Sequence, residues 1–280
     1  MARIKNQYPS TENQGQSDGG IRLAPPPGGD GVSDPCYIPG VETSRVSTPP
    51  GGGGPSNGGL DLRAWFGDMD IYLFDQLLKG RFRTGMRLLD AGCGTGRNLT
   101  YFLRGGFDVH AVDEDGDALD HVREMAAELA PALPADHFRT ERIEAMSFPP
   151  ARFDAILCNA VLHFARDEDH FQAMLAGLWK ALAAGGLLFM RLASSIGIED
   201  RLERMEDGLY RMPAGGTWFL VNEAKLLLAT ERLDAEMVEP LKTVNVQNLR
   251  CMTTWVLRKK PDRKPREARP DSPRLDPALS

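Results

Sequence analysis

The sequence has no closely spaced pair of cysteines, no long apolar segment and no excess of positive charge. Its four cysteines are scattered without a Cys-x-x-Cys motif, which excludes the common structural zinc sites and a disulfide framework. No apolar run approaches the roughly 20 residues that span a bilayer. The net charge of −6 provides no general attraction to nucleic acid or to an anionic membrane. We therefore expect a cytoplasmic protein without a bound metal, and we expect neither a membrane nor nucleic acid as its partner.

Two segments at the ends of the sequence contain too few apolar residues to form a core. Residues 1–59 are rich in glycine, proline, serine and asparagine, and residues 259–280 alternate charged side chains with prolines. We expect both segments to be disordered. The roughly 200 residues between them, 60–258, are enough for one domain.

The most specific motif is a glycine-rich turn that joins a predicted strand to a predicted helix. The strand ends in Asp90, and Gly92, Gly94 and Gly96 follow at alternate positions. Glycine permits positive φ and lets the backbone approach a ligand closely. The helix that opens near Asn98 directs its free N–H groups at the turn. The turn is therefore a candidate ligand site.

The kind of ligand follows from the residues around this turn. The dinucleotide pattern G-x-G-x-x-G fails because Arg97 occupies its sixth position, and the P-loop lysine is absent. The Asp90 carboxylate at the strand tip would repel a pyrophosphate. A ligand with both an ammonium and a carboxylate group fits better, and the methionine half of S-adenosylmethionine has both.

The segment from Asp90 to Gly96 resembles motif I of class I S-adenosylmethionine-dependent methyltransferases, D-x-G-x-G-x-G. The resemblance extends from about Asp61 to Lys260. It implies that the protein is a methyltransferase with S-adenosylmethionine as its cofactor. The general pattern is similar to the branch of the family that methylates small molecules by direct in-line transfer.

The resemblance also implies individual cofactor contacts. Asp113, at the end of the next predicted strand, matches the acid that binds the ribose hydroxyls, and Glu114 follows it beside the adenine. Many family members have an acid after the third strand, but Arg142 stands there, so only backbone and apolar contacts are carried over to Ile143. Asn159 ends the fourth strand, which faces the transferred methyl. The expected cofactor-binding residues are Asp90, Gly92, Gly94, Gly96, Asp113, Glu114, Ile143 and Asn159.

Predicted strands and helices alternate along the domain. Together with the resemblance, this predicts an α/β fold: a Rossmann-like, seven-stranded, mostly parallel sheet with helices on both faces and an antiparallel last strand. The expected strands are 86–90, 108–113, 137–142, 154–158 and 187–191, with a final hairpin of 241–246 and 252–257. The expected helices are 98–104, 119–129, 171–182 and 223–232.

The methyl acceptor should bind beyond the carboxyl ends of the strands. His163 either removes a proton from the acceptor or packs at the start of a helix. Arg191 either binds an anionic acceptor or pairs with an internal acid. Tyr72 either covers the site or belongs to the core. Residues 192–216, which include Tyr210, are either a lid over the acceptor or a surface insertion without a ligand role.

We therefore expect His163 and Arg191 as catalytic residues and Tyr72, His163, Arg191 and Tyr210 as acceptor-binding residues. Two alternatives to a small-molecule methyltransferase remain open. The first is a protein or RNA methyltransferase that uses the basic residues of the C-terminal tail. The second is a cofactor-binding regulatory protein without catalysis. The sequence does not indicate the oligomeric state.

Overall fold

The computed structural model describes residues 61–213 and 215–261, all within one compact unit of the chain, Pro49–Ser280. The expectation of disorder for residues 1–59 lies outside the described residues, as does most of the expected C-terminal tail. The start of that tail is ordered, because the last strand of the sheet continues to Lys259.

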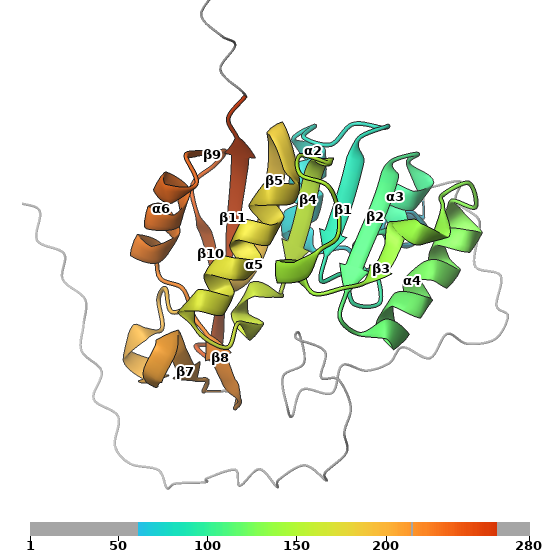
Figure 1. The fold of residues 1–280 in the computed structure, drawn as a ribbon. Helices are drawn as coiled ribbons and strands as arrows, with labels where there is room; N and C mark the ends of the chain where they lie inside the picture. The colour runs from blue at the N-terminus through green and yellow to red at the C-terminus, as the bar shows by residue number, and fades with distance from the viewer. Residues whose placement is uncertain (1–60, 214, 262–280) are drawn as a thin grey trace, which may run out of the picture. The chain divides into compact units, whose positions relative to one another are not determined.

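A central sheet with helices on both faces forms the domain (Figure 1). Its strands are β1 (Arg87–Ala91), β2 (Asp108–Asp113), β3 (Phe138–Thr140), β4 (Phe153–Asn159), β5 (Leu182–Ser194), β9 (Ala235–Met237), β10 (Lys242–Val246) and β11 (Arg250–Lys259). The helices are α1 (Leu62–Phe66), α2 (Ile71–Leu78), α3 (Thr100–Arg104), α4 (Gly116–Leu129), α5 (Glu168–Ala181) and α6 (Glu223–Arg232).

The strand order is β10-β11-β5-β4-β1-β2-β3, and β9 pairs with the far end of β11. In the described part of the chain, eight strands thus fill seven positions, because β9 and β10 pair with different parts of β11. The strands from β3 to β5 are parallel, whereas β11 runs antiparallel to β5. The predicted seven-stranded, mostly parallel sheet with an antiparallel last strand is confirmed, and β10 and β11 form the predicted hairpin.

Alternating side chains of the strands build two cores, one on each face of the sheet. Leu89, Ile156 and Leu188 pack under α5 and α6. Their neighbours Leu88 and Leu157 pack on the other face with α2, α3 and α4. Figure 1 shows α2 and α5 on opposite faces. Burial on both faces explains why these strands are continuous apolar runs.

The fifth strand is longer than predicted, and the helix before it is shifted. The predicted helix 171–182 begins earlier, because the Asp167 side chain accepts the backbone N–H of His170 and caps α5. It ends earlier too, because Leu182 pairs with Phe153 of β4 and starts β5. By contrast, α6 has the predicted bounds, and the Asn222 side chain caps it.

Residues 192–216, the expected lid, begin as the end of β5 and continue into a small sheet. This small sheet consists of β6 (Glu203–Arg204), β7 (Leu209–Arg211) and β8 (Thr217–Phe219), paired in antiparallel order. Its last strand lies beyond the predicted boundary of the insertion.

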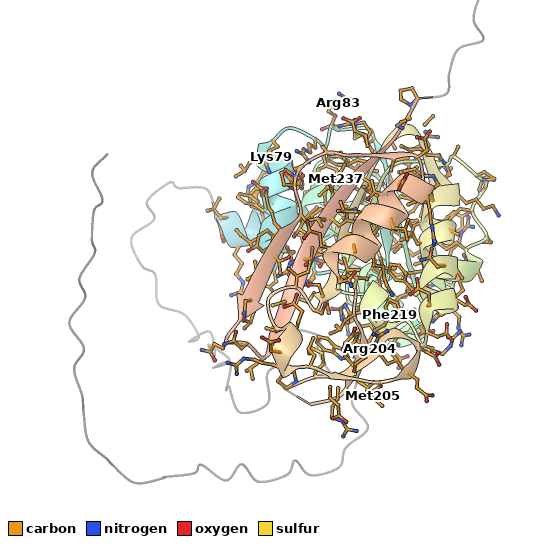
Figure 2. The ribbon with its side chains drawn as sticks, turned by 90° about the vertical axis from the view of Figure 1, so that its left-hand side faces the viewer. Lys79, Arg83, Arg204, Met205, Phe219 and Met237 are labelled. Carbon is orange, nitrogen blue, oxygen red and sulfur yellow. The ribbon has the colours of Figure 1, made fainter. Side chains whose placement is uncertain are left out.

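The small sheet packs at the carboxyl end of β5. Met212 is buried with Ala193 of β5 and Met252 of β11, and Tyr210 packs against this cluster. Figure 2 shows Arg204 of the small sheet at the end of the domain opposite Arg83. The small sheet therefore adjoins the strand ends where the ligand site is expected, and its role as a lid stays a prediction.

Candidate functional site

Four predicted site residues meet at one edge of the sheet. Asp90, Asp113, Asn159 and Arg191 lie at or near the carboxyl ends of β1, β2, β4 and β5. These strands are parallel neighbours in the sheet, so residues far apart in the sequence share one edge. Ligands of open α/β sheets bind at such an edge.

The three glycines of the turn have different roles. All three have positive φ. A Cβ at Gly92 would lie 2.5 Å from a methyl of Val161, and one at Gly96 would lie 2.9 Å from the terminal methyl of Met125. A Cβ at Gly94 would meet no atom of the protein within 4 Å. Gly92 and Gly96 therefore permit close packing, while Gly94 presents bare backbone to open space.

Asp113 is held in place by this turn. Its Oδ2 accepts the N–H of Gly94 at 2.7 Å, and its Oδ1 accepts the N–H of Asp115 at 3.0 Å. A carboxylate has about four lone-pair positions, so two remain for further donors. The side chain is thus fixed by two backbone donors and has capacity for two more, and its contact with ribose hydroxyls stays a prediction.

Asp90 is buried, and neither of its carboxylate oxygens has a hydrogen-bond partner among the described residues. Burial raises the pKa of this carboxyl to about 7; the positive charge of Arg97 opposes the rise, and the charge of Asp113 adds to it. Burying such a group without a partner is costly. Asp90 therefore has the environment of a carboxylate that binds a cation, and an ammonium group fits it.

Arg191 has an internal acidic partner that the sequence analysis did not identify. Its Nη1 lies 3.2 Å from Oδ2 of Asp70, and the same oxygen lies 3.6 Å from Nη2 of Arg97. Asp70 caps α2, and its backbone N–H donates to Asn98 Oδ1 at 3.0 Å. An aspartate directly before an apolar helical segment indicates a helix cap, so the sequence carried a signal for the capping role of Asp70. It carried no signal for the ion pair of Asp70 with Arg191.

The Tyr72 ring contacts the side chain of Arg191. The Arg191 guanidinium carbon lies 4.9 Å from the centroid of the Tyr72 ring, a cation–π distance. Tyr72 also packs at the edge of the core around α2. The ring thus covers one face of the guanidinium group, and its role toward a ligand stays a prediction.

The environment of His163 favours the packed alternative. The ring is buried next to Phe164 and Trp218, and Nδ1 accepts the N–H of Ala193 at 3.4 Å. Burial lowers the pKa of His163 to about 3, and the charges of Arg250 and Arg191 lower it further. Because Nδ1 accepts, the neutral ring carries its proton on Nε2, which has no hydrogen-bond partner among the described residues and is able to donate a proton but not to remove one.

The remaining predicted residues have other surroundings. Glu114 is exposed and pairs with Arg142, at 3.3 Å between Oε2 and Nε. Ile143 is buried in a short 3-10 helix (Ile143–Ala145), where its carbonyl oxygen closely approaches Gly177 of α5. Tyr210 is half-buried on β7. Contacts of these three residues with a ligand stay predictions.

One histidine cluster was not apparent from the sequence spacing. Asp108, His110 and His137 meet at the amino end of β2, with Nε2 of His110 3.3 Å from Oδ1 of Asp108. Nη2 of Arg152 lies 3.2 Å from the same Nε2 and 3.3 Å from Oδ2 of Asp108. A cation thus already contacts the cluster, which we interpret as an ion-pair network.

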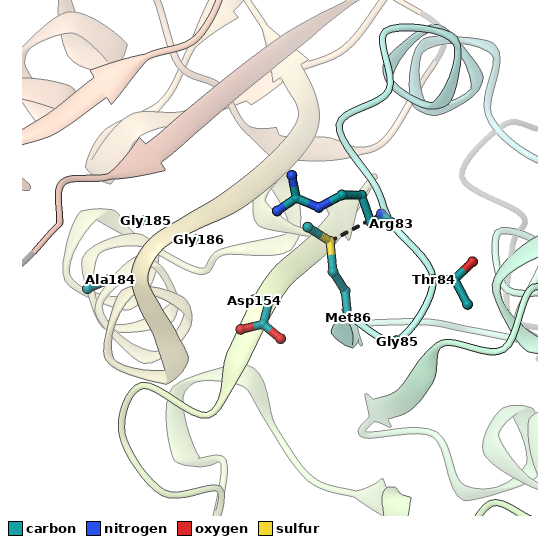
Figure 3. A pocket seen from close by; sticks show the side chains of 8 residues that line it. All are labelled: Arg83, Thr84, Gly85, Met86, Asp154, Ala184, Gly185 and Gly186. Atoms are coloured by element: carbon teal, nitrogen blue, oxygen red, sulfur yellow. Dashed lines mark hydrogen bonds between the residues drawn. The ribbon is translucent and has the colours of Figure 1, made fainter.

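A cavity of about 400 Å³ lies at the opposite end of the sheet, near the amino ends of β1 and β4 (Figure 3). Its lining includes Asp154, but this carboxylate is paired with Arg87 at 2.6 Å. The residues that line this cavity are Arg83, Thr84, Gly85, Met86, Asp154, Ala184, Gly185 and Gly186. None of them is a predicted site residue.

The fold, the glycine turn and the two acids agree with those expected for a class I methyltransferase domain. Residues 88–186 match the family model of the methyltransferase domain. The described fold and this match together confirm the class to which the sequence was assigned.

Individual relatives cover only part of this chain. A malonyl-[acyl-carrier protein] O-methyltransferase of Enterobacter lignolyticus is 33% identical over 109 residues, which are 39% of each chain. A ubiquinone biosynthesis O-methyltransferase of Methylocella silvestris is 33% identical over 105 residues, 38% of this chain and 39% of the relative. The chain thus spans about two fifths of the length of these relatives.

Solved structures support the fold. The 1,6-didemethyltoxoflavin-N1-methyltransferase of Burkholderia thailandensis, solved with S-adenosylhomocysteine, has a TM-score of 0.52 and 22% identity over 67% of this chain and 76% of its own. The PH0226 protein of Pyrococcus horikoshii has a TM-score of 0.55 and 15% identity over 71% of this chain and 97% of its own. At these identities the likeness concerns the fold alone.

Proposed function

We propose that this protein is an S-adenosylmethionine-dependent methyltransferase that transfers the methyl group directly to a small-molecule acceptor. The observation that carries the proposal is the buried Asp90 carboxylate, without a hydrogen-bond partner in the described structure, beside the bare backbone of Gly94. In this assignment Asp90 binds the ammonium group of the cofactor, Asp113 binds the ribose hydroxyls and Gly94 faces the adenosine. Glu114 and Ile143 lie on the adenine side.

The curated relatives support a small acceptor group and leave open which atom receives the methyl group, because the similar toxoflavin enzyme is named as an N1-methyltransferase. Both curated relatives described above are named as O-methyltransferases, one in ubiquinone biosynthesis and one acting on a malonyl group carried by a protein. Among the residues described, no helix is long and apolar enough to cross a membrane. A cytoplasmic location is part of the proposal.

The chemistry requires little from the protein. The sulfonium of the cofactor supplies an electrophilic methyl group. The protein holds the acceptor in line with that group, and this positioning provides most of the rate enhancement. Asn159 and Arg191 lie toward the carboxyl ends of β4 and β5, the strands that follow β1 and its Asp90 in the order of the sheet. Because burial keeps His163 neutral and its Nδ1 already accepts the N–H of Ala193, we do not assign proton removal to it.

The test combines cofactor binding with methyl transfer. Calorimetry should show that the full chain binds S-adenosylmethionine, and Asp113→Ala should lose about 1.5–3 kcal/mol for each ribose hydrogen bond removed. Asp120→Ala, an exposed position on α4, is the matched control. Incubation with radiolabelled S-adenosylmethionine and a metabolite extract should then label a small product.

The alternatives give other results in the same assay. If RNA or protein carries the label, and the label is lost when residues 262–280 are removed, the acceptor is a macromolecule and not a small molecule. Tight cofactor binding with no labelled product would favour a regulatory protein. No binding of S-adenosylmethionine would overturn the proposal.

A further inference from the structure

Three polar side chains form a continuous row across neighbouring strands at the site. Asn159 of β4 is in register with Arg191 of β5, which is in register with Thr254 of β11. Residues in register on neighbouring strands project from the same face of a sheet. This face is the one covered by α2, because Leu157 and Phe189, two residues earlier on β4 and β5, pack there. We call these three residues the polar row.

Asn159 and Thr254 of the polar row are buried and Arg191 is partly buried, yet several polar atoms of the row have no hydrogen-bond partner among the residues that the structure describes. Asn159 is 7% exposed and Thr254 is 2% exposed. Within residues 61–213 and 215–261, no group hydrogen-bonds the side-chain amide of Asn159, the hydroxyl of Thr254 or Nε of Arg191. Native proteins rarely leave buried polar groups in this state, and adjacent ones indicate a ligand that satisfies them together.

The charge of the row favours an anionic ligand. Arg191 shares the Asp70 carboxylate with Arg97, so Asp70 does not fully neutralise it. The Tyr72 ring covers a face of the guanidinium group, which leaves the edge of that group for hydrogen bonds. Nε of Arg191, the amide nitrogen of Asn159 and the hydroxyl of Thr254 are all able to donate. Together they match the oxygens of a carboxylate.

The next row toward the strand ends is apolar. Ala193 of β5 is in register with Met252 of β11, and both are buried against Met212. Tyr210 and Trp218 of the small sheet pack at the border of this cluster. A ligand that lies on both rows therefore meets donors on one side and apolar side chains on the other.

We propose that the polar row binds the carboxylate of an aromatic or apolar acceptor acid, which deepens the proposed function and rests on it. Asn159 lies nearest to the cofactor side of the row, and Thr254 lies farthest. Neighbouring strands are roughly 5 Å apart, so Arg191 and Thr254 lie about one and two strand spacings from Asn159. Arg191 and Thr254 thus determine specificity for acids.

The experiment uses matched aromatic probes and the full chain with S-adenosylhomocysteine bound. Saturation-transfer NMR is recorded with benzoate, cinnamate and 2-naphthoate and with the corresponding carboxamides. We expect the carboxylates to bind at least about tenfold more tightly than the amides, because a site built for hydrogen bonds to one group rejects an analogue that cannot make them. Thr254→Val, which keeps the side-chain shape, should weaken carboxylate binding by roughly tenfold.

Thr253→Val is the matched control. Thr253 is adjacent on β11 but projects to the other face, where its hydroxyl bonds Ser194 and Thr243. This variant should leave the preference for carboxylates unchanged. Equal binding of acids and amides, or carboxylate binding that Thr254→Val does not weaken, would overturn the inference while the proposed function stands. Absence of S-adenosylmethionine binding in calorimetry would overturn both.

Discussion

Asp90 links the strength of cofactor binding to pH. Burial raises the pKa of its carboxyl to about 7, and only the ionised form attracts an ammonium group. Binding must therefore release a proton below that pKa. We expect the affinity for S-adenosylmethionine to increase as pH rises from about 5.5 to about 7.5, by up to tenfold per pH unit below the pKa.

Calorimetry at several pH values tests this prediction. Asp90→Asn should bind the cofactor more weakly and lose this pH dependence, because the amide does not titrate. A wild-type affinity that stays constant over the same range would contradict the assignment of Asp90 to the ammonium group.

The glycines of the turn should separate folding from binding. Gly94→Val places its side chain in open space, at the cost of a strained positive φ. Gly92→Val places it against Val161. We expect Gly94→Val to keep a cooperative thermal transition while losing cofactor binding, and Gly92→Val to lower the transition temperature as well. Normal cofactor binding by the Gly94 variant would show that the turn is only structural.

The small sheet should affect the acceptor more than the cofactor. Tyr210 is half-buried at its inner border, so Tyr210→Ala should raise the KM for the acceptor several-fold and leave cofactor affinity unchanged. Met212 is a poorer test, because it is buried and its truncation would cost about 2–5 kcal/mol of stability.

Hydrogen exchange provides the second measurement for this element. If the small sheet closes over the acceptor, its amide groups should exchange more slowly when cofactor and acceptor are both bound. Exchange that remains equally fast in the ternary complex would rule out a lid.

The sequence predicted those elements whose signals are local. The turn around Asp90, the second acid Asp113 and the bounds of α6 all depend on residues close together in the chain. The start of β5 was missed, because Leu182 looks like the last apolar residue of a helix until its pairing with Phe153 is known. The small sheet was missed for the same reason, since its strands are two or three residues long and depend on pairing.

The contact of Asp70 with Arg191 illustrates what local patterns leave out in the site. The two residues lie on an N-terminal helix cap and on the fifth strand, and nothing near either of them in the sequence specifies the other. The polar row could not be predicted from local sequence either, because Thr254 is only one residue of an apolar predicted strand. Such pairings follow from the register of the sheet.

The whole domain should lose stability in mild acid through two buried histidines. Burial lowers the pKa of His163 to about 3, and burial with the neighbouring cations lowers the pKa of His110. Both are neutral when folded and take up a proton more readily when unfolded. The two histidines therefore leave the free energy of unfolding unchanged above about pH 6.5. Below that pH they lower it, by up to about 1.4 kcal/mol per histidine and pH unit.

Asp90 opposes this loss, because its raised pKa makes the folded state bind a proton below about pH 7. Chemical denaturation at pH 7.0, 6.0 and 5.0 should thus show that the free energy of unfolding decreases by about the amount expected for one histidine. Asp90→Asn should make the fall steeper, and His163→Gln should make it shallower. Parallel profiles for all three proteins would show that these groups do not titrate as the structure indicates.

The position of Asp70 has a consequence for how two ligands influence each other. Its carboxylate is shared by Arg97, next to the glycine turn, and by Arg191, in the polar row. A ligand that draws one guanidinium away leaves the carboxylate to the other, so occupancy of one half of the site changes the free energy of filling the other half. This is thermodynamic coupling through one charge, and it is reciprocal. Cooperativity between cofactor and acceptor would then be set by Asp70, the N-cap of α2, which lies outside the sheet that carries the site.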